Sequence, residues 1–146
     1  MVHIPHNAYV FVGDGRKALI LRNDGDAQSP NLKTERVFTD DNPSTHEQGT
    51  DRPGRSFSSV GAGRSSVAQT DWHDLEEHRF ARDVASRLER IVRERGVEAL
   101  VIVAPPRTLA DLRKTFHDDV KKKIVAEIDK DLTKLPIDAI GKHLAA

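Results

Sequence analysis

The amino-acid sequence predicts an α/β fold in which helices cover a mixed β-sheet. Three observations support this prediction: short strand-like runs over residues 8–38, a long amphipathic helical pattern over residues 70–95, and an apolar run directly after it. Runs joined by tight turns pair antiparallel, whereas a helix between two strands is the usual connection of parallel strands. The expected element order is β-β-β-α-β-α-α.

The N-terminal part predicts an antiparallel meander of three strands. Residues 8–12 and 17–22 are rich in aromatic and branched apolar side chains, and the turn "GDGR" between them favours a hairpin. After a turn-rich stretch, residues 32–38 partly alternate apolar and polar side chains, which indicates a third strand.

The best-defined element is a helix that begins at Thr70 or Asp71 and ends before Gly96. Acidic side chains cluster near its expected start and arginines near its end, as the helix dipole favours. Apolar side chains recur at a spacing of three and four: Trp72, Leu75, Phe80, Val84, Leu88, Ile91 and Val92. This stripe should pack against the sheet, while most of the helix arginines face water.

The C-terminal part predicts one further strand followed by helices. Residues 98–104 form a near-continuous apolar run, which is typical of a strand in the middle of a sheet. A Pro-Pro pair ends this strand, and Thr108 with Asp111 offers a capping box for a short helix. Spacing of four residues then predicts another helix bearing Val120, Ile124, Ile128 and Leu132. Pro136 can open a last helix.

These elements together predict a single domain over residues 1–146, an α/β sandwich of the ribonuclease H-like type, with residues 42–69 as a long loop insert. The chain has 146 residues, a usual size for one domain. The chain has 23 Asp and Glu residues and 23 Lys and Arg residues, so its formal charges balance. Any nucleic-acid binding therefore has to rest on a local patch of positive charge. The absence of cysteine excludes disulfides, thiolate nucleophiles and Cys-based zinc sites. With no signal peptide and no long apolar segment, we expect a cytoplasmic protein without membrane insertion.

The insert 42–69 could be a linker, a phosphate cradle or an RNA-contacting tip. A Walker-type phosphate loop requires glycine where Ser58 stands and lysine where Arg64 stands, so that motif is excluded. Such a long aperiodic segment is uncommon in a compact domain unless it is functional or disordered.

The candidate RNA-binding side chains of this insert are Arg52, Arg55, Arg64 and Phe57, together with Gln48. Arginines, glycine-exposed backbone N–H groups and an aromatic ring are the groups that bind single-stranded RNA. Plain flexible disorder would give a similar composition. The arginines and lysines of the helices alternate with acids, which is typical of a solvated surface.

The sequence predicts neither a metal site nor a cofactor. His73 and His78 lie about 140° apart around a helix, so they do not share one face. A hydrolase built around His73, Asp74 and Glu77 is a third possibility, which would need a pocket. The residues indicate no ligand and no oligomeric state.

Four blocks of the sequence resemble the bacterial host attachment protein family. They are "DNPSTHEQGTDRPGRSFSS", "TDWHDLEEHRFARDVASRLER", "LVIVAPPRTLADLR" and "EIDKDLTKLP", and the resemblance extends over nearly the whole chain. That family is similar to the central domain of archaeal and eukaryotic class-one peptide release factors. The resemblance implies a ribonuclease H-like fold with a long loop that reaches the peptidyl-transferase centre of the ribosome.

The resemblance also implies a function and one departure from it. In the release factors, a Gly-Gly-Gln motif at the loop tip positions water against peptidyl-tRNA, and this sequence has no such motif; Gln48 followed by Gly49 comes nearest. This departure argues against peptide release and favours ribosome or tRNA contact through the loop, in rescue or dormancy. The family name implies an alternative, a factor for attachment of the bacterium to host cells, acting at the surface or indirectly.

Overall fold

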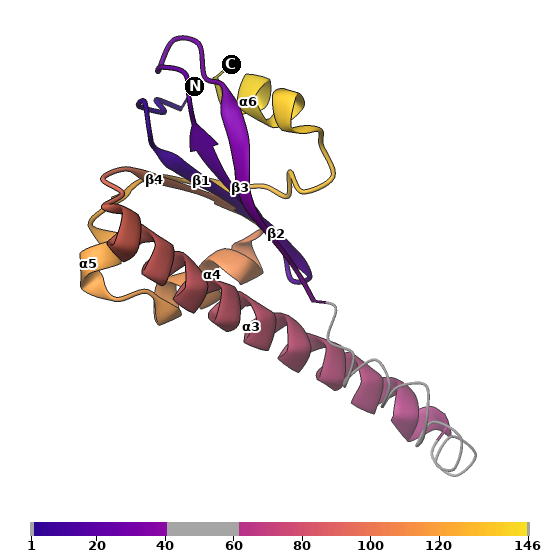
Figure 1. The fold of residues 1–146 in the computed structure, drawn as a ribbon. Helices are drawn as coiled ribbons and strands as arrows, with labels where there is room; N and C mark the ends of the chain where they lie inside the picture. The colour runs from indigo at the N-terminus through magenta and orange to yellow at the C-terminus, as the bar shows by residue number, and fades with distance from the viewer. Residues whose placement is uncertain (1, 41–61, 146) are drawn as a thin grey trace.

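The computed structural model of the protein describes residues 2–40 and 62–145, and Figure 1 shows their arrangement. Five strands form one mixed sheet in the order β3-β2-β1-β4-β5. They are β1 (Tyr9–Gly13), β2 (Lys17–Asn23), β3 (Leu32–Thr39), β4 (Leu100–Ala104) and β5 (Ile124–Asp129). The pairs β1–β2 and β2–β3 are antiparallel, and the pairs β1–β4 and β4–β5 are parallel.

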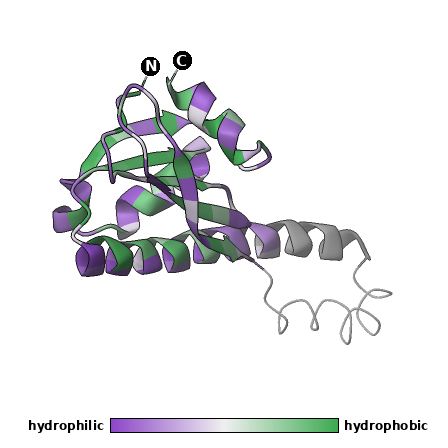
Figure 2. Ribbon diagram, turned by 45° about the horizontal axis from the view of Figure 1, so that its top comes forward, coloured by the Kyte–Doolittle hydropathy of each residue, from purple (hydrophilic) through white to green (hydrophobic). Residues whose placement is uncertain are grey.

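Helices cover both faces of the sheet. One face carries α3 (Ala62–Arg95), α4 (Pro106–Thr115) and the short α5 (Asp118–Lys121), and the other carries α6 (Ile137–Ala145) (Figure 1). Colouring by hydropathy shows green, apolar strands between the layers and an α3 whose hydrophilic side is turned outward (Figure 2). The N-terminal end of α3 projects beyond the sheet (Figure 1).

The two central strands are apolar throughout because both of their faces are covered. Every residue of β1 and β4 is buried. Phe11 and Ile102 point into the core beneath α3 and α4, whereas Val10 and Val101 point into the core beneath α6. Successive side chains of a strand alternate between faces, so each strand supplies both cores.

Most of the predicted elements are present. The hairpin, the third strand, the apolar internal strand β4 and the last helix are confirmed. The helical crossover is confirmed too: α3 connects β3 to β4, which pairs parallel with β1. The end of α3 is confirmed too: Gly96 has a φ of 59°, and the N–H of Val97 donates to the carbonyl of Val92. Glycine accepts this left-handed conformation without a steric penalty, which is why it ends the helix.

The predicted start of this helix is wrong. The helix α3 begins at Ala62, so residues 62–69 are helical and not part of a loop. The acids near Asp74 lie well inside the helix, and its first turn has no acidic residue. A helical segment beyond the edge of the sheet needs no apolar stripe, so periodicity does not reveal it.

The predicted helix through Val120, Ile124, Ile128 and Leu132 is also wrong. Only Asp118–Lys121 is helical, and Ile124–Asp129 forms the fifth strand, paired parallel with β4. A spacing of four residues is also a multiple of the two-residue period of a strand, so the pattern fitted both structures.

The predicted capping box of α4 does not form. The N-cap residue is Pro105, without a side-chain hydrogen bond to the helix, and Thr108 is buried. Asp111 instead forms a hydrogen bond with His78 of α3, and its Oδ2 lies 2.5 Å from Nδ1 of the histidine. The two residues therefore join neighbouring helices.

Both edge strands contain an extra residue that interrupts their pairing. Ile20 pairs with Arg36 and Leu21 with Thr34, which leaves Glu35 unpaired on β3. On the other edge, the register passes from Ile124 to Ala126 and leaves out Val125. Such bulges bend a strand and redirect the side chain of the extra residue.

Candidate functional site

Most of the predicted RNA-binding residues lie outside the described part of the chain. Gln48, Arg52, Arg55 and Phe57 belong to residues 41–61, of which the structure gives no description. Arg64 lies in α3 and not in a loop, and its side chain is also outside the description. The structure does define the place where this segment joins the folded body.

The segment leaves the body where three elements meet. The N–H of Asp40, directly after β3, donates to the carbonyl of Arg16 in the β1–β2 turn at 2.7 Å. That turn packs closely on α3, because a Cβ at Gly15 would lie 2.7 Å from Cγ of Glu77. Arg107 of α4 reaches the same part of α3, with Nη2 3.1 Å from Asp74. The N-terminal end of the segment thus leaves from a fixed end of the sheet, and α3, which follows the segment, is held to that same end of the sheet at Glu77.

The possible hydrolase residues His73, Asp74 and Glu77 do not form a catalytic arrangement. Arg107 engages both carboxylates, at 3.1 Å from Asp74 and 4.0 Å from Glu77. His73 is exposed, and no hydrogen bond or ion pair joins it to either acid. Within the described ranges, no group of three or more His, Asp or Glu side chains is arranged to hold a metal ion.

A groove of about 550 Å³ runs between the edge strand β3 and α3, next to the root of the segment. Its floor includes Phe38, whose ring lies 5.3 Å from the guanidinium carbon of Arg87. Arg87 pairs with Asp83 at 3.3 Å, and the other arginine of the groove, Arg79, pairs with Glu76 at 3.2 Å. Because its positive charges are matched by acids, the groove favours an aromatic or neutral group over a phosphate.

The prediction that Trp72 and Leu75 pack against the sheet is wrong, because both lie on the solvent-facing side of α3. Leu75 is 62% exposed and Trp72 is 43% exposed, whereas Val84, Leu88 and Ile91 are buried as predicted. At about 100° per residue, Trp72 and Leu75 lie at least about 100° from the centre of the buried stripe. A three-and-four spacing between neighbours therefore does not put the first and last members on one face.

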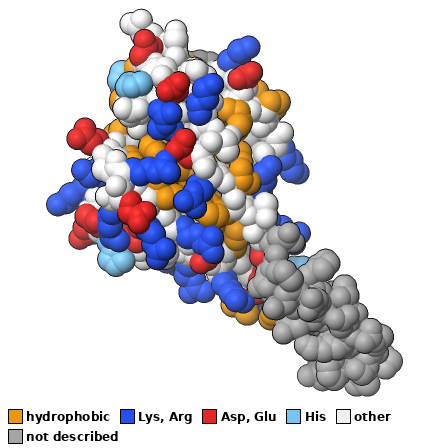
Figure 3. Space-filling view, viewed as in Figure 1, with side chains coloured by type: hydrophobic (Ala, Val, Ile, Leu, Met, Phe, Trp, Pro, Cys, Tyr) orange, Lys and Arg blue, Asp and Glu red, His pale blue; other side chains and the backbone are white. Residues whose placement is uncertain are grey.

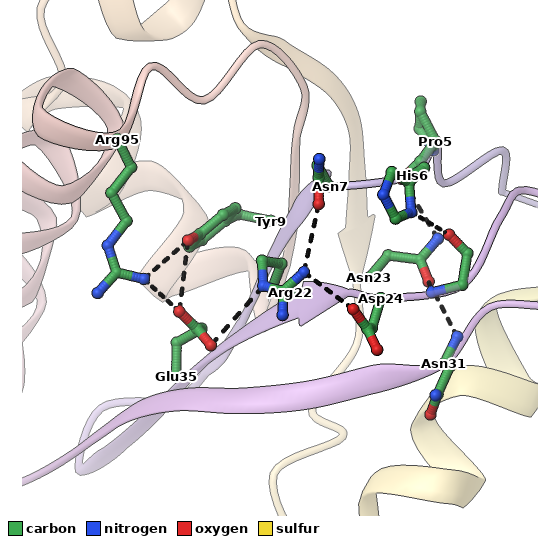
Figure 4. A network of polar contacts seen from close by, with 11 residues as sticks. Pro5, His6, Asn7, Tyr9, Arg22, Asn23, Asp24, Asn31, Glu35 and Arg95 are labelled. Atoms are coloured by element: carbon green, nitrogen blue, oxygen red, sulfur yellow. Dashed lines mark hydrogen bonds and ion pairs between the residues drawn. The ribbon is translucent and has the colours of Figure 1, made fainter.

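A polar network fixes the other end of α3 to the sheet. Arg95 donates to the hydroxyl of Tyr9 at 2.9 Å and also binds Glu35, the extra residue of the β3 bulge (Figure 4). Arg22 joins the network, with Nε 3.8 Å from Glu35. Hydrogen bonds to Tyr9 and Glu35 raise the pKa of Arg95, which stays charged. The bulge thus turns Glu35 toward the helix end.

Two His–carboxylate pairs join α3 to the helices beside it. His78 binds Asp111, and the buried carboxylate of Glu89 accepts a hydrogen bond from the backbone N–H of His117 at 2.6 Å. The His117 ring lies 3.1 Å from the same carboxylate. These pairs stiffen the layer formed by α3, α4 and α5.

The comparison with known protein families identifies the chain. Residues 7–144 match the model of bacterial archaeo-eukaryotic release factor family 12. The chain belongs to this family. The match covers β1 through α6 and supports the release-factor likeness, while the host attachment role has no counterpart in it.

About half of the chain is similar in sequence to a curated relative. It is the uncharacterized protein RP470 of Rickettsia prowazekii (strain Madrid E), 30% identical over 79 residues. The aligned region covers 53% of each of the two chains, so the family member spans about half the length of this relative.

None of the described helices combines the length and apolar character needed to cross a membrane.

Sequence reasoning missed the arrangement of arginines on the outer side of α3. The interleaved acids made this helix resemble an ordinary solvated surface. Angular sorting around the helix would not have separated Arg82 and Arg90 from the acids, because Asp83, Glu89 and Glu94 lie four or seven residues from one of them. Only the ion-pair partners in the structure make the distinction.

Proposed function

We propose that the protein acts in translation by binding RNA of the ribosome or tRNA through residues 42–69. The family match over residues 7–144 carries this proposal, because it relates nearly the whole chain to release factors. Its RNA-binding residues would be Gln48, Arg52, Arg55, Phe57 and Arg64. The arginines would bind phosphates, and Phe57 would stack on a base or anchor the segment.

The anchoring of the segment supports the proposal. The segment follows Asp40, which is held by the β1–β2 turn, and α3, which comes after the segment, contacts the same turn at Glu77. The N-terminal end of α3 projects beyond the sheet, which leaves it accessible to a large RNA (Figure 1). We assign the fold to the ribonuclease H-like type, since the strand order β3-β2-β1-β4-β5 with three antiparallel strands and a parallel pair is compatible with it.

Peptide release is not part of the proposed function. The sequence lacks the Gly-Gly-Gln motif of the release factors that it resembles, so we expect no release of peptide from peptidyl-tRNA on ribosomes. Release well above the background of a ribosome-only control would contradict this assignment.

The test is a salt series of RNA binding with the purified protein and a single-stranded RNA. Three phosphate contacts predict a slope of log affinity against log salt near about −2, because each contributes about −0.7. The variant Arg52→Gln/Arg55→Gln/Arg64→Gln should bind more weakly and with a flatter slope. A charge-matched control replaces three exposed lysines by glutamine: Lys33, Lys134 and Lys142. Equal binding by the wild type and the arginine variant would refute the role of these residues.

Cell fractionation separates the proposal from the attachment alternative. A cytoplasmic, ribosome-associated protein should sediment with ribosomes and leave them as salt rises. A factor that acts at the bacterial surface should instead be found in the envelope or the medium, and that result would favour attachment.

A further inference from the structure

We infer that the outer face of α3 is a second RNA-contacting surface, which binds phosphates of base-paired RNA beside the segment 42–69. This inference rests on the proposed function and extends it to residues that are part of the folded body. The outer face consists of Trp72, Leu75, Arg79, Arg82, Ser86, Arg90 and Arg93, all of them exposed.

These residues form one line along the helix. At about 100° per residue, they fall within an arc of about 80°, on the side opposite the buried stripe. The helix contains no lysine, so the blue side chains that lie along α3 in Figure 3 are arginines. The face is therefore a straight ridge whose arginines follow one another after three or eight residues, which is about one or two turns.

The acids of the helix lie beside this ridge and not on it. Glu89 is buried against His117, and Glu76 is nearly buried. Asp83 turns to Arg87 at 3.3 Å on the flank that faces β3. The exposed Glu94 follows Arg90 by four residues on that same flank. The carboxylates thus border a strip on which the exposed charged side chains are all arginines.

Two arginines of the ridge have no acid of their own. Arg79 pairs with Glu76, and Arg93 forms two hydrogen bonds with Asp119 at 2.8 and 3.0 Å. Among the described residues, by contrast, Arg82 and Arg90 form no ion pair. An unpaired surface guanidinium keeps all of its donors for a phosphate, which it can bind with two hydrogen bonds.

The shape of the ridge favours base-paired RNA over a flexible strand. Arg82 and Arg90 are separated by about 12 Å along a rigid helix axis. The helix is held in place by its contacts with α4 and α5, so these cations cannot follow a mobile backbone. Phosphates of an RNA stem are fixed in space, and double-stranded RNA is recognised by its shape and backbone.

Trp72 gives the ridge an intrinsic reporter. It is the only tryptophan of the chain, lies on the ridge and is 43% exposed. A bound RNA stem would shield its ring from solvent. Its fluorescence should therefore become less accessible to acrylamide when tRNA is added.

The experiment measures binding of unfractionated tRNA to the full chain between 50 and 200 mM salt. Loss of two phosphate contacts in Arg82→Gln/Arg90→Gln should reduce the salt slope by about 1.8, since each contributes about 0.9 on a duplex. The ratio of wild-type to variant affinity should then shrink about twelvefold over this fourfold range of salt. A control with the same charge change, Lys134→Gln/Lys142→Gln, alters the region of α6 on the opposite face of the sheet. All variants should keep the wild-type circular dichroism and melting temperature, because the changed side chains are exposed.

Four outcomes decide the inference. A smaller slope in the Arg82/Arg90 variant alone, with less protection of Trp72, supports it. Equal losses in this variant and the lysine control would reduce the effect to net charge and overturn it. Unchanged tRNA binding in the Arg82/Arg90 variant, together with a loss in Arg52→Gln/Arg55→Gln/Arg64→Gln, would overturn the ridge and leave the proposed function standing. If wild-type protein binds no RNA, the proposed function fails and the inference with it.

A ribosome-binding assay separates RNA from protein as the partner of the ridge. The Arg82/Arg90 variant should lose affinity for ribosomes and for free tRNA alike. Loss of ribosome binding with unchanged tRNA binding would place a ribosomal protein on the ridge and contradict the inference.

Discussion

The side chain of Asn23, at the end of β2, is fully buried and holds two loops together. Its Nδ2 donates to the carbonyls of Ile4, Pro5 and Asp26. Its Oδ1 accepts from the N–H groups of Gly25 and Asn31, and Figure 4 shows Asn23 together with Pro5 and Asn31. Buried backbone groups need such partners, so one amide replaces the water that these loops would otherwise require.

Asn23→Asp should therefore destabilise the protein by more than about 2 kcal/mol. The substitution puts an oxygen where Nδ2 donates, so the carbonyls of Ile4 and Asp26 lose this donor, and a buried group left unsatisfied costs about 1–3 kcal/mol. The carbonyl of Pro5 loses it too but still accepts from the N–H of Ala8. The control Asn31→Asp makes the same chemical change at an exposed side chain and should stay within about 0.5 kcal/mol. Urea unfolding followed by circular dichroism measures both, and equal effects would contradict the role of Asn23.

The ion pair between Asp119 and Arg93 predicts a pH dependence. The hydrogen bond from Arg93 lowers the pKa of Asp119 to about 2. A lowered carboxyl pKa adds stability that is fully present above the ordinary pKa of aspartate and is lost as the pH falls through about 2. Asp119→Asn should lower the urea midpoint at pH 7, and this difference from wild type should shrink steadily as the pH falls from about 4 to about 2. The control Asp118→Asn should behave like wild type across this range, and a difference for Asp119→Asn that is as large at pH 2 as at pH 7 would exclude this pair as its cause.

At the scale of elements, α3 has one buried and one exposed leucine that test its orientation. Leu88 lies on the inner side of the helix and is fully buried, whereas Leu75 is 62% exposed. Leu88→Ala should cost about 2–5 kcal/mol of stability, the range for a leucine in a core. Leu75→Ala removes the same atoms from solvent-exposed surface and should change stability by less than about 0.5 kcal/mol. Denaturant unfolding of both variants checks the orientation, which comparable losses would refute.

Prediction of these elements from sequence succeeded where burial dictates the residues. Apolar side chains need a covered face, so they allow few arrangements of the elements that carry them. This applies to the apolar runs of β1 and β4 and to the buried stripe from Phe80 to Val92. Prediction failed for β5 and for the start of α3. The strand β5 alternates between half-buried and exposed residues, and the start of α3 extends past the sheet, so neither produces a distinctive pattern.

The candidate site was less predictable than the fold for a related reason. Composition identified Arg52, Arg55 and Phe57, but only the three-dimensional arrangement of charges distinguishes Arg82 and Arg90 from neighbours that are neutralised. Whether an arginine is paired depends on residues distant in sequence, such as Asp119 for Arg93. Local sequence therefore shows that cations are present and does not show which of them are available.

At the scale of the whole molecule, the sheet lies between two cores that share their strands. The core under α3 and α4 contains Phe11 and Ile102, and the core under α6 contains Val12 and Val103. Because adjacent residues of one strand belong to different cores, neither core can open without disturbing the other. This arrangement is consistent with residues 1–146 as one cooperative domain.

Hydrogen exchange tests this cooperativity. Amides of β1 and β4 should exchange most slowly, and those of the edge strands β3 and β5 faster, since protection follows burial and hydrogen bonding. Heat or urea should unfold the protein in a single transition by circular dichroism. Separate transitions for the α6 side and the α3 side would show two independent units.

The bulges at Glu35 and Val125 bear on how the protein behaves when concentrated. A straight outer strand offers a row of unpaired N–H and C=O groups that can recruit another chain, which is how fibrils grow. Here the row is broken on β3 by Glu35, which is bound to Arg95, and on β5 by Val125. An incoming strand would find regular partners for only a few residues on either side of each break. The irregular edges therefore protect the sheet against fibril growth, and deleting Val125 would restore a continuous edge that such growth could use.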